Sequence, residues 1–302
     1  MNISNLKTRI LFALWAAPVG WWFVNSELNL VDFLGTGTTL YPGQVLAAAL
    51  ILCGAYEYCR MLGKKYSING FHLSYIYLLY QFTGHFWKEI ALTKSLDTYA
   101  LLIIVAVEAT VWGRHSSSRW KRASLLFSGT AFLSLAGLSL LNFYSDSFRI
   151  LVNPATNHPM TSQTGIIIVL LSIFLCDTAA FIAGSLIGKH HFSSVSPKKT
   201  IEGSAAGLVT AVLISITGFL LFGNREHLGP YLIPVGLTIG LVIGFAGQAG
   251  DLLVSLMKRY FNVKDSSSLI PGHGGILDRF DSLFFTAPAL QLVLFITSSF
   301  IH

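Results

Sequence analysis

Long apolar stretches separated by short polar loops dominate the chain. Nine windows have the composition of membrane spans, at residues 10–24, 40–61, 71–86, 98–112, 125–144, 164–188, 203–222, 231–256 and 282–301. A helix needs about 20 mostly apolar residues to cross a bilayer, so the first, third and fourth windows are short. The pattern predicts an all-α, polytopic integral membrane helical bundle of about nine transmembrane helices.

One long polar segment interrupts this pattern. Residues 145–163 are rich in Ser, Asp, Asn, Pro and Thr and form the longest loop on the predicted external side. We therefore predict a boundary that separates an N-terminal transmembrane bundle, residues 1–163, from a C-terminal transmembrane part, residues 164–302. The C-terminal part holds most of the unusual polar residues.

The composition supports a membrane location. Only 11% of the 302 residues are charged, whereas 53% are hydrophobic. Soluble domains carry about a quarter charged residues, so this chain has too few to cover a water-facing surface. The high apolar content also excludes a disordered chain.

The positions of the basic residues predict the topology. If the N-terminus is cytoplasmic, 16 of the 20 Lys and Arg residues fall in cytoplasmic segments, and only Lys88, Lys94, Arg149 and Arg225 lie outside. This asymmetry follows the positive-inside rule. It explains the net charge of +6 by topology, and we expect no nucleic-acid binding.

Four acidic residues fall within the predicted spans: Glu57, Glu108, Asp177 and Asp251. A carboxylate at membrane depth is unfavourable unless it is paired or hydrated, so each is a candidate functional residue. Arg60, three residues after Glu57, is positioned to neutralise it, and a structural role stands beside a functional one. For Glu108 we favour a structural hydrogen bond.

Small residues accompany the other two acids. Ala180, Gly184 and Gly188 recur every four residues after Asp177 and form a stripe that another helix or a ligand can approach closely. Helix packing alone explains these glycines well but the aspartate poorly. Three glycines also precede Asp251 and would let its backbone bend or bring the acid close to a phosphate.

Two polar loops have the residues needed to bind phosphates. Residues 196–203 read Ser-Pro-Lys-Lys-Thr-Ile-Glu-Gly and precede a predicted helix, so cations, hydroxyls and backbone N–H groups are available together. Residues 255–282 contain four cations, three acids, one histidine and three glycines. Asp251, Asp278 and Asp281 offer oxygen ligands for Mg²⁺. His273 is either a turn residue or a functional one.

The second loop carries a long and specific motif. Residues 255–281 read Ser-x-Met-Lys-Arg-x4-Lys-Asp-x-Ser-x2-Ile-Pro-x-His-Gly-Gly-Ile-x-Asp-Arg-Phe-Asp. This stretch resembles the signature of the phosphatidate cytidylyltransferases, also called CDP-diacylglycerol synthases. The block from Asp177 to Gly203 is similar to an earlier motif of that family, with Phe181 in place of Tyr. Strong resemblance covers residues 177–281.

The resemblance implies an integral membrane enzyme, usually a homodimer, that converts CTP and phosphatidate to CDP-diacylglycerol and pyrophosphate with Mg²⁺. It implies that Asp251 and Asp278 bind the metal and that Lys199 is an essential phosphate-loop lysine. We expect Asp281 and Asp177 to act as further ligands of this metal or of a second cation. The remaining expected contacts of CTP or the lipid phosphate are Ser196, Lys198, Thr200, Lys258, Arg259, Lys264, His273 and Arg279.

The expected location is the bacterial cytoplasmic membrane, with residues 164–302 forming the catalytic part and its substrate loops facing the cytoplasm. Two other functions remain open. One is CTP-dependent chemistry on another lipid, such as a polyprenol, which a panel of substrates would separate. The other is a transporter that uses the intramembrane acids. Transporters often have repeated halves with broken helices, and the sequence has neither feature.

Overall fold

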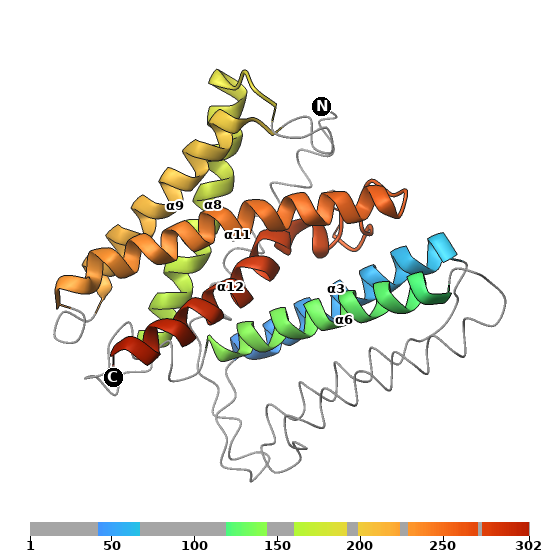
Figure 1. Ribbon diagram of the computed structural model, residues 1–302, viewed down its shortest axis with the longest axis horizontal. Helices are drawn as coiled ribbons and strands as arrows, with labels where there is room; N and C mark the ends of the chain where they lie inside the picture. Colours follow the sequence, from blue (N-terminus) through green and yellow to red (C-terminus); the bar gives the residue numbers. More distant parts are fainter. Residues whose placement is uncertain are drawn as a thin grey trace, which may run out of the picture. The chain divides into compact units, whose positions relative to one another are not determined.

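The computed structural model describes residues 42–66, 119–143, 160–191, 199–223, 229–270 and 274–301. Within these ranges the chain forms the α-helices α3 (Pro42–Tyr66), α6 (Arg119–Asn142), α8 (Met160–Ile187), α9 (Ile201–Phe222), α11 (Leu232–Tyr260) and α12 (Leu277–Ile301), and the 3-10 helix η1 (Gly229–Tyr231). No strand occurs among the described elements, apart from two isolated β-bridges. The prediction of an all-α protein is confirmed for these residues (Figure 1).

Within the described residues, five segments are long and apolar enough to cross a membrane: Pro42–Lys65, Ser124–Asn142, Thr164–Ile187, Ile201–Phe222 and Gly229–Tyr260. They coincide with the second, fifth, sixth, seventh and eighth predicted windows. Helix α12 covers the ninth window and begins before it, at Leu277. The first, third and fourth windows lie outside the described residues, so the count of nine stays a prediction.

The chain divides into two compact units. Unit 1 comprises Met1–Leu138 and Tyr260–Arg279, and unit 2 comprises Ser139–Arg259 and Phe280–His302. This division groups residues 260–279 with the N-terminal helices, although they come late in the sequence. The sequence-based boundary between residues 163 and 164 stays a prediction.

In unit 1, α3 and α6 lie side by side (Figure 1). The Tyr58 hydroxyl of α3 donates to the Leu125 carbonyl of α6 at 2.6 Å. Gly129 of α6 faces the Tyr58 ring so closely that a Cβ at this position would overlap the ring. A small residue therefore allows a large aromatic side chain to fill the space between these two helices.

In unit 2, close contacts at glycines join α8, α9, α11 and α12. A Cβ at Gly207 of α9 would lie 2.9 Å from the Cys176 carbonyl of α8, and one at Gly240 of α11 would lie 2.5 Å from Val212 Cα of α9. Gly250 of α11 approaches α12 in the same way. Ser172 and Ser215 also form a buried hydrogen bond between α8 and α9, at 3.1 Å. Small residues and interhelical hydrogen bonds are typical of helix packing in membranes.

The predicted stripe after Asp177 takes part in this packing. Gly184 of α8 lies against the Thr200 hydroxyl and Gly203 of α9, and Ala180 faces Gly207. The interpretation of the stripe as a helix-packing surface is confirmed. Other side chains of α8 point outwards, since Phe174, Phe181 and Leu186 are 76%, 75% and 77% exposed. Large apolar residues on an outer face are expected where lipid covers the helix.

Candidate functional site

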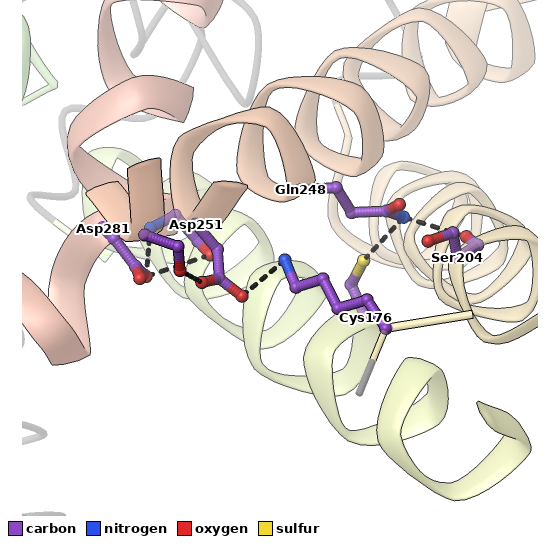
Figure 2. A network of polar contacts seen from close by, with 8 residues as sticks. Cys176, Ser204, Gln248, Asp251 and Asp281 are labelled. Atoms are coloured by element: carbon purple, nitrogen blue, oxygen red, sulfur yellow. Dashed lines mark hydrogen bonds and ion pairs between the residues drawn. The ribbon is translucent and has the colours of Figure 1, made fainter. Parts of the chain in front are cut away.

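Three carboxylates and one lysine of unit 2 form a group that we call the Lys199 cluster. Asp177 comes from α8, Lys199 lies just before α9, Asp251 comes from α11, and Asp281 lies near the start of α12. Lys199 Nζ is 2.5 Å from Asp251 Oδ2. Asp177 and Asp281 each interact electrostatically with Asp251 and with Lys199. Figure 2 shows Asp251 beside Asp281. The structure thus brings together four of the predicted site residues.

The Lys199 cluster has more acidic than basic groups, because three carboxylates share one ammonium group. The side chains of Lys199 and Asp251 are 26% and 35% exposed, and Asp281 is 8% exposed. Neutral donors give limited support: Ser255 Oγ lies 3.4 Å from Asp251 Oδ1, and Ser282 N donates to Asp281 Oδ1 at 2.7 Å. The carboxylates repel one another, and this repulsion is most unfavourable at the buried Asp281. The cluster is therefore suited to bind a cation.

The donor chemistry of this cluster fits Mg²⁺, which prefers oxygen ligands. Among the described residues, no three His, Cys, Asp or Glu side chains converge closely enough to hold a metal ion by themselves. This is compatible with Mg²⁺, which usually binds through one or two carboxylates together with waters and substrate phosphates. Asp177 is exposed and Asp251 is partly exposed, and Asp251 is the acid in contact with the lysine.

Local hydrogen bonds fix the backbone next to Lys199. Thr200 is the N-cap of α9, where its side chain accepts a hydrogen bond from Gly203 N at 3.1 Å. Glu202, in the first turn, accepts from His190 N at 3.3 Å and lies 2.6 Å from His190 Nδ1. An N-cap side chain satisfies a backbone donor that the helix itself leaves unpaired. The prediction of a helix that starts directly after the lysine pair is confirmed.

Gln248 of α11 forms hydrogen-bonding contacts near the Lys199–Asp251 ion pair. Its amide nitrogen donates to the Ser204 carbonyl of α9 at 2.9 Å and lies 4.0 Å from Cys176 Sγ of α8 (Figure 2). Gln248 comes three residues before Asp251 in the same helix. It therefore links three helices next to the Lys199–Asp251 ion pair. The sequence interpretation missed this residue.

Asp278 belongs to a second group, in unit 1. It lies in the first turn of α12, and its Oδ2 accepts hydrogen bonds from Ser266 N at 2.9 Å and from Gly275 N at 3.0 Å. Ser266 Oγ lies 2.9 Å from the same oxygen. These contacts fold the loop between α11 and α12 around the start of α12.

Glu57 of α3 is the other carboxylate of this group, and it has no exposed surface. Its donors are the Ser266 and Ser267 hydroxyls and the backbone N–H groups of Ile276 and Leu277. All of them come from the loop and the start of α12. For the described residues, the expectation that Arg60 neutralises Glu57 is therefore wrong. We call Glu57 with these four donors the Glu57 cluster.

Comparison with known proteins identifies the family. A model named "Cytidylyltransferase family" matches residues 7–297. The chain belongs to the cytidylyltransferase family. The match covers nearly the whole chain, whereas the motifs in the sequence covered residues 177–281. The N-terminal half of the chain is therefore part of the family match.

Several relatives of this cytidylyltransferase are similar along most of their length. A phosphatidate cytidylyltransferase of Synechocystis sp. is 39% identical over 288 residues, which cover 89% of this chain and 87% of the relative. One of Staphylococcus haemolyticus is 43% identical over 266 residues, covering 85% and 90%. One of Staphylococcus epidermidis is 42% identical over 272 residues, covering 89% and 83%.

The remaining predicted site residues of the cytidylyltransferase are distributed over both units. Lys258 and Arg259 lie in the last turn of α11, in unit 2. Lys264 in the loop and Arg279 in the first turn of α12 are exposed residues of unit 1. Thr200 is buried at 6% exposed and caps α9. Ser196, Lys198, His273 and the intramembrane acid Glu108 lie outside the described residues.

Proposed function

We propose that the chain is a phosphatidate cytidylyltransferase, which transfers CMP from CTP to phosphatidate and releases pyrophosphate. The observation that carries this proposal is the 39–43% identity to proteins of that name over most of each chain. The Lys199–Asp251 ion pair supports it, because it joins a phosphate-binding type of side chain to a metal-binding type.

The proposed reaction needs little proton transfer. An oxygen of the phosphatidate phosphate attacks the α-phosphorus of CTP and forms a new P–O bond. The bond between the α-phosphorus and the bridging oxygen breaks, and pyrophosphate leaves with the electron pair. The second pKa of a phosphate monoester is about 6, so the attacking group is largely ionised at neutral pH. No general base is required.

The main task of the protein is then to bring two anions together. In the proposal, Lys199 binds a phosphate oxygen of CTP or of phosphatidate, and the cations on α11, on α12 and in the loop bind other phosphate oxygens. As the family resemblance implies, Asp251 and Asp278 would hold Mg²⁺, and Asp281 and Asp177 would contribute to the same ion or to a second cation. Mg²⁺ would neutralise charge on the reacting phosphates and on the leaving pyrophosphate.

The complete set of proposed phosphate contacts stays as the sequence predicts it: Ser196, Lys198, Lys199, Thr200, Lys258, Arg259, Lys264, His273 and Arg279. We further propose about nine transmembrane helices, a cytoplasmic N-terminus with substrate loops on the same side, a location in the bacterial inner membrane, and a homodimer. The apolar windows of the sequence support the helix count, the charge asymmetry of the loops supports the topology, and the bacterial relatives support the location.

The function is tested by incubating the purified protein in detergent with CTP, phosphatidate and MgCl₂. We expect CDP-diacylglycerol and pyrophosphate in equal amounts, with neither product when CTP, phosphatidate or the metal is left out. Release of pyrophosphate without a cytidylylated lipid would contradict the proposal. A clear preference for polyprenyl phosphate over phosphatidate would move the function to another lipid.

Two lysine variants provide a matched comparison. Lys199→Ala is expected to abolish most of the activity, because it removes the cation next to Asp251. Lys64→Ala, at an exposed position in the last turn of α3, is expected to keep it. Equal activity of both variants would exclude a direct role for Lys199.

A further inference from the structure

Helix α3 holds the connection between α11 and α12 at both of its ends. Lys65 Nζ donates to the Tyr260 carbonyl at 2.5 Å and lies 3.4 Å from the centre of the Tyr260 ring. Tyr58 packs edge-on against Phe261, with ring centres 5.8 Å apart. Glu57 receives the other end of the connection, at the start of α12. Glu57 and Lys65 are eight residues apart and therefore lie on one face of α3.

The charges of these two side chains match the helix ends that they contact. Tyr260 is the last residue of α11, where unpaired carbonyls attract a cation. Leu277 is the first residue of α12, where unpaired N–H groups attract an anion. The positively charged Lys65 contacts the C-terminal end of α11, and the negatively charged Glu57 contacts the N-terminal end of α12.

The hydrogen bonds of Glu57 occupy its whole carboxylate. Oε1 accepts from Ser267 Oγ at 2.6 Å and from Ile276 N at 2.8 Å, and Oε2 accepts from Leu277 N at 2.8 Å with Ser266 Oγ also at 2.8 Å. Each oxygen thus has two donors within hydrogen-bonding distance. The burial of a charge is unfavourable unless such partners compensate it. Since Glu57 is fully buried and its oxygens are occupied, it is not placed to touch a substrate.

The loop approaches Glu57 too closely for any side chain at Gly275. A Cβ at this position would overlap Ser266 Oγ and would lie 2.5 Å from Glu57 Oε2. Gly275 N and Ser266 N both donate to Asp278. Ser266 and Gly275 therefore lie against Glu57 and also donate hydrogen bonds to the Asp278 carboxylate. A shift of the Glu57 side chain would therefore move Asp278 through Ser266 and through Gly275.

We propose that Glu57 is a positioning residue for the reaction, because it holds Ser266, Ser267 and residues 275–277, and thereby the Asp278 carboxylate at the start of α12. The expected effect of Glu57 on activity rests on the proposed function, whereas its effect on the loop does not. It assigns to a transmembrane helix of the N-terminal half the task of holding the motif-bearing loop in its working conformation.

The test compares the full-length Glu57→Gln variant with the wild type in detergent. Glutamine keeps the shape of the side chain but turns an NH₂ group towards donors, so it breaks hydrogen bonds on one oxygen. We expect faster hydrogen–deuterium exchange in peptides covering residues 266–277. We also expect kcat to fall by about 10- to 100-fold, as small misplacements of site residues produce, with little change in the KM for CTP.

Ile51→Ala is the matched control, because Ile51 is a fully buried residue of α3 outside the Glu57 cluster. It should lower the thermal unfolding midpoint yet keep kcat and the exchange of residues 266–277 at temperatures below that midpoint. Ser267→Ala, which removes one donor, should reproduce the effects of Glu57→Gln in weaker form.

Three results would overturn the proposal: unchanged exchange of residues 266–277 in Glu57→Gln, an unchanged kcat in an active enzyme, or an equal loss of kcat in Ile51→Ala. The exchange measurement does not depend on turnover. If the wild type makes no CDP-diacylglycerol, the proposed function fails, and faster exchange in Glu57→Gln would still support the role of Glu57 in holding the loop.

Discussion

The acidic residues of the two units are compensated in different ways. In unit 1, Glu57 and Asp278 are surrounded by hydroxyl and backbone N–H donors that carry no formal charge. In unit 2, Asp177, Asp251 and Asp281 share Lys199 and have few such donors.

This difference indicates what each group can do. A carboxylate whose oxygens are already hydrogen-bonded gains little from a new ligand, and its contacts make the surrounding backbone rigid. Carboxylates that share too little positive charge gain much from a cation. We therefore assign positioning to the Glu57 cluster and substrate chemistry to the Lys199 cluster. Asp278 combines both properties, since it carries a predicted metal-binding role and three contacts to its own loop.

The largest effect is expected at Asp251. Asp251→Asn should lower kcat by on the order of 10²- to 10³-fold, because it removes the charge of a proposed metal ligand. The thermal midpoint should not fall, since the remaining carboxylates repel each other less. Steady-state kinetics and thermal unfolding in detergent measure both quantities. Near wild-type turnover would remove Asp251 from the reaction.

The next effect concerns the spacing of α11 and α12. Gly250→Ala should destabilise the protein by about 1–3 kcal/mol, because it overpacks this contact. Its Cβ would lie 2.8 Å from the Asp281 carbonyl and from Phe285. Gly247→Ala is the control, because the nearest atom to its Cβ would be Thr286 Oγ1 at 3.5 Å. Equal midpoints of the two variants in a thermal unfolding experiment would contradict the close packing.

A pair of amide substitutions tests the comparison directly. Asp177→Asn should stabilise the metal-free protein by about 1 kcal/mol, because it relieves repulsion from the neighbouring acids. Glu57→Gln should destabilise it, because it interrupts a complete set of hydrogen bonds. The thermal midpoints should therefore shift in opposite directions. Shifts of the same sign would show that the two groups are not compensated differently.

The smallest effect is expected at the N-cap of α9. Thr200→Ala should cost about 0.5–1 kcal/mol, because Gly203 N loses its acceptor. Thr200→Ser keeps a hydroxyl and should restore the stability. Thr210→Ala, whose hydroxyl donates to the Ala206 carbonyl within the same helix, is a control with little expected change. A loss of activity in Thr200→Ala that exceeds its loss of stability, and that Thr200→Ser restores, would instead favour the predicted contact of Thr200 with substrate.

Much of the helical structure could be predicted because hydropathy is a local property. The second and fifth to eighth apolar windows coincide with helices that are able to span a membrane. The stripe of Ala180 and Gly184 also indicated a close helix contact, since spacing by four residues determines which side chains share a face. The partner helix, α9, follows directly in the chain.

The contacts of the acids could not be predicted in the same way. Neighbours in sequence suggested Arg60 as the partner of Glu57, whereas the donors lie between 209 and 220 residues away. Hydropathy identifies Asp177 and Asp251 as unusual, but their assignment to one cluster depends on how three helices pack. Gln248 gave a weaker signal, because a neutral amide is less conspicuous in an apolar span than a charge.

The contacts of Lys65 and Glu57 in α3 with the connection between α11 and α12 also have a consequence for the order of biosynthesis. Domains form progressively from the N-terminus as the ribosome elongates the chain. Lys65 and Glu57 are therefore in place long before Tyr260 and Leu277 are synthesised. The loop finds its acceptors only when the last helix follows it into place. A nascent chain that stops before α12 thus contains Glu57 and Lys65 but lacks the Leu277 donor and the Asp278 acceptor.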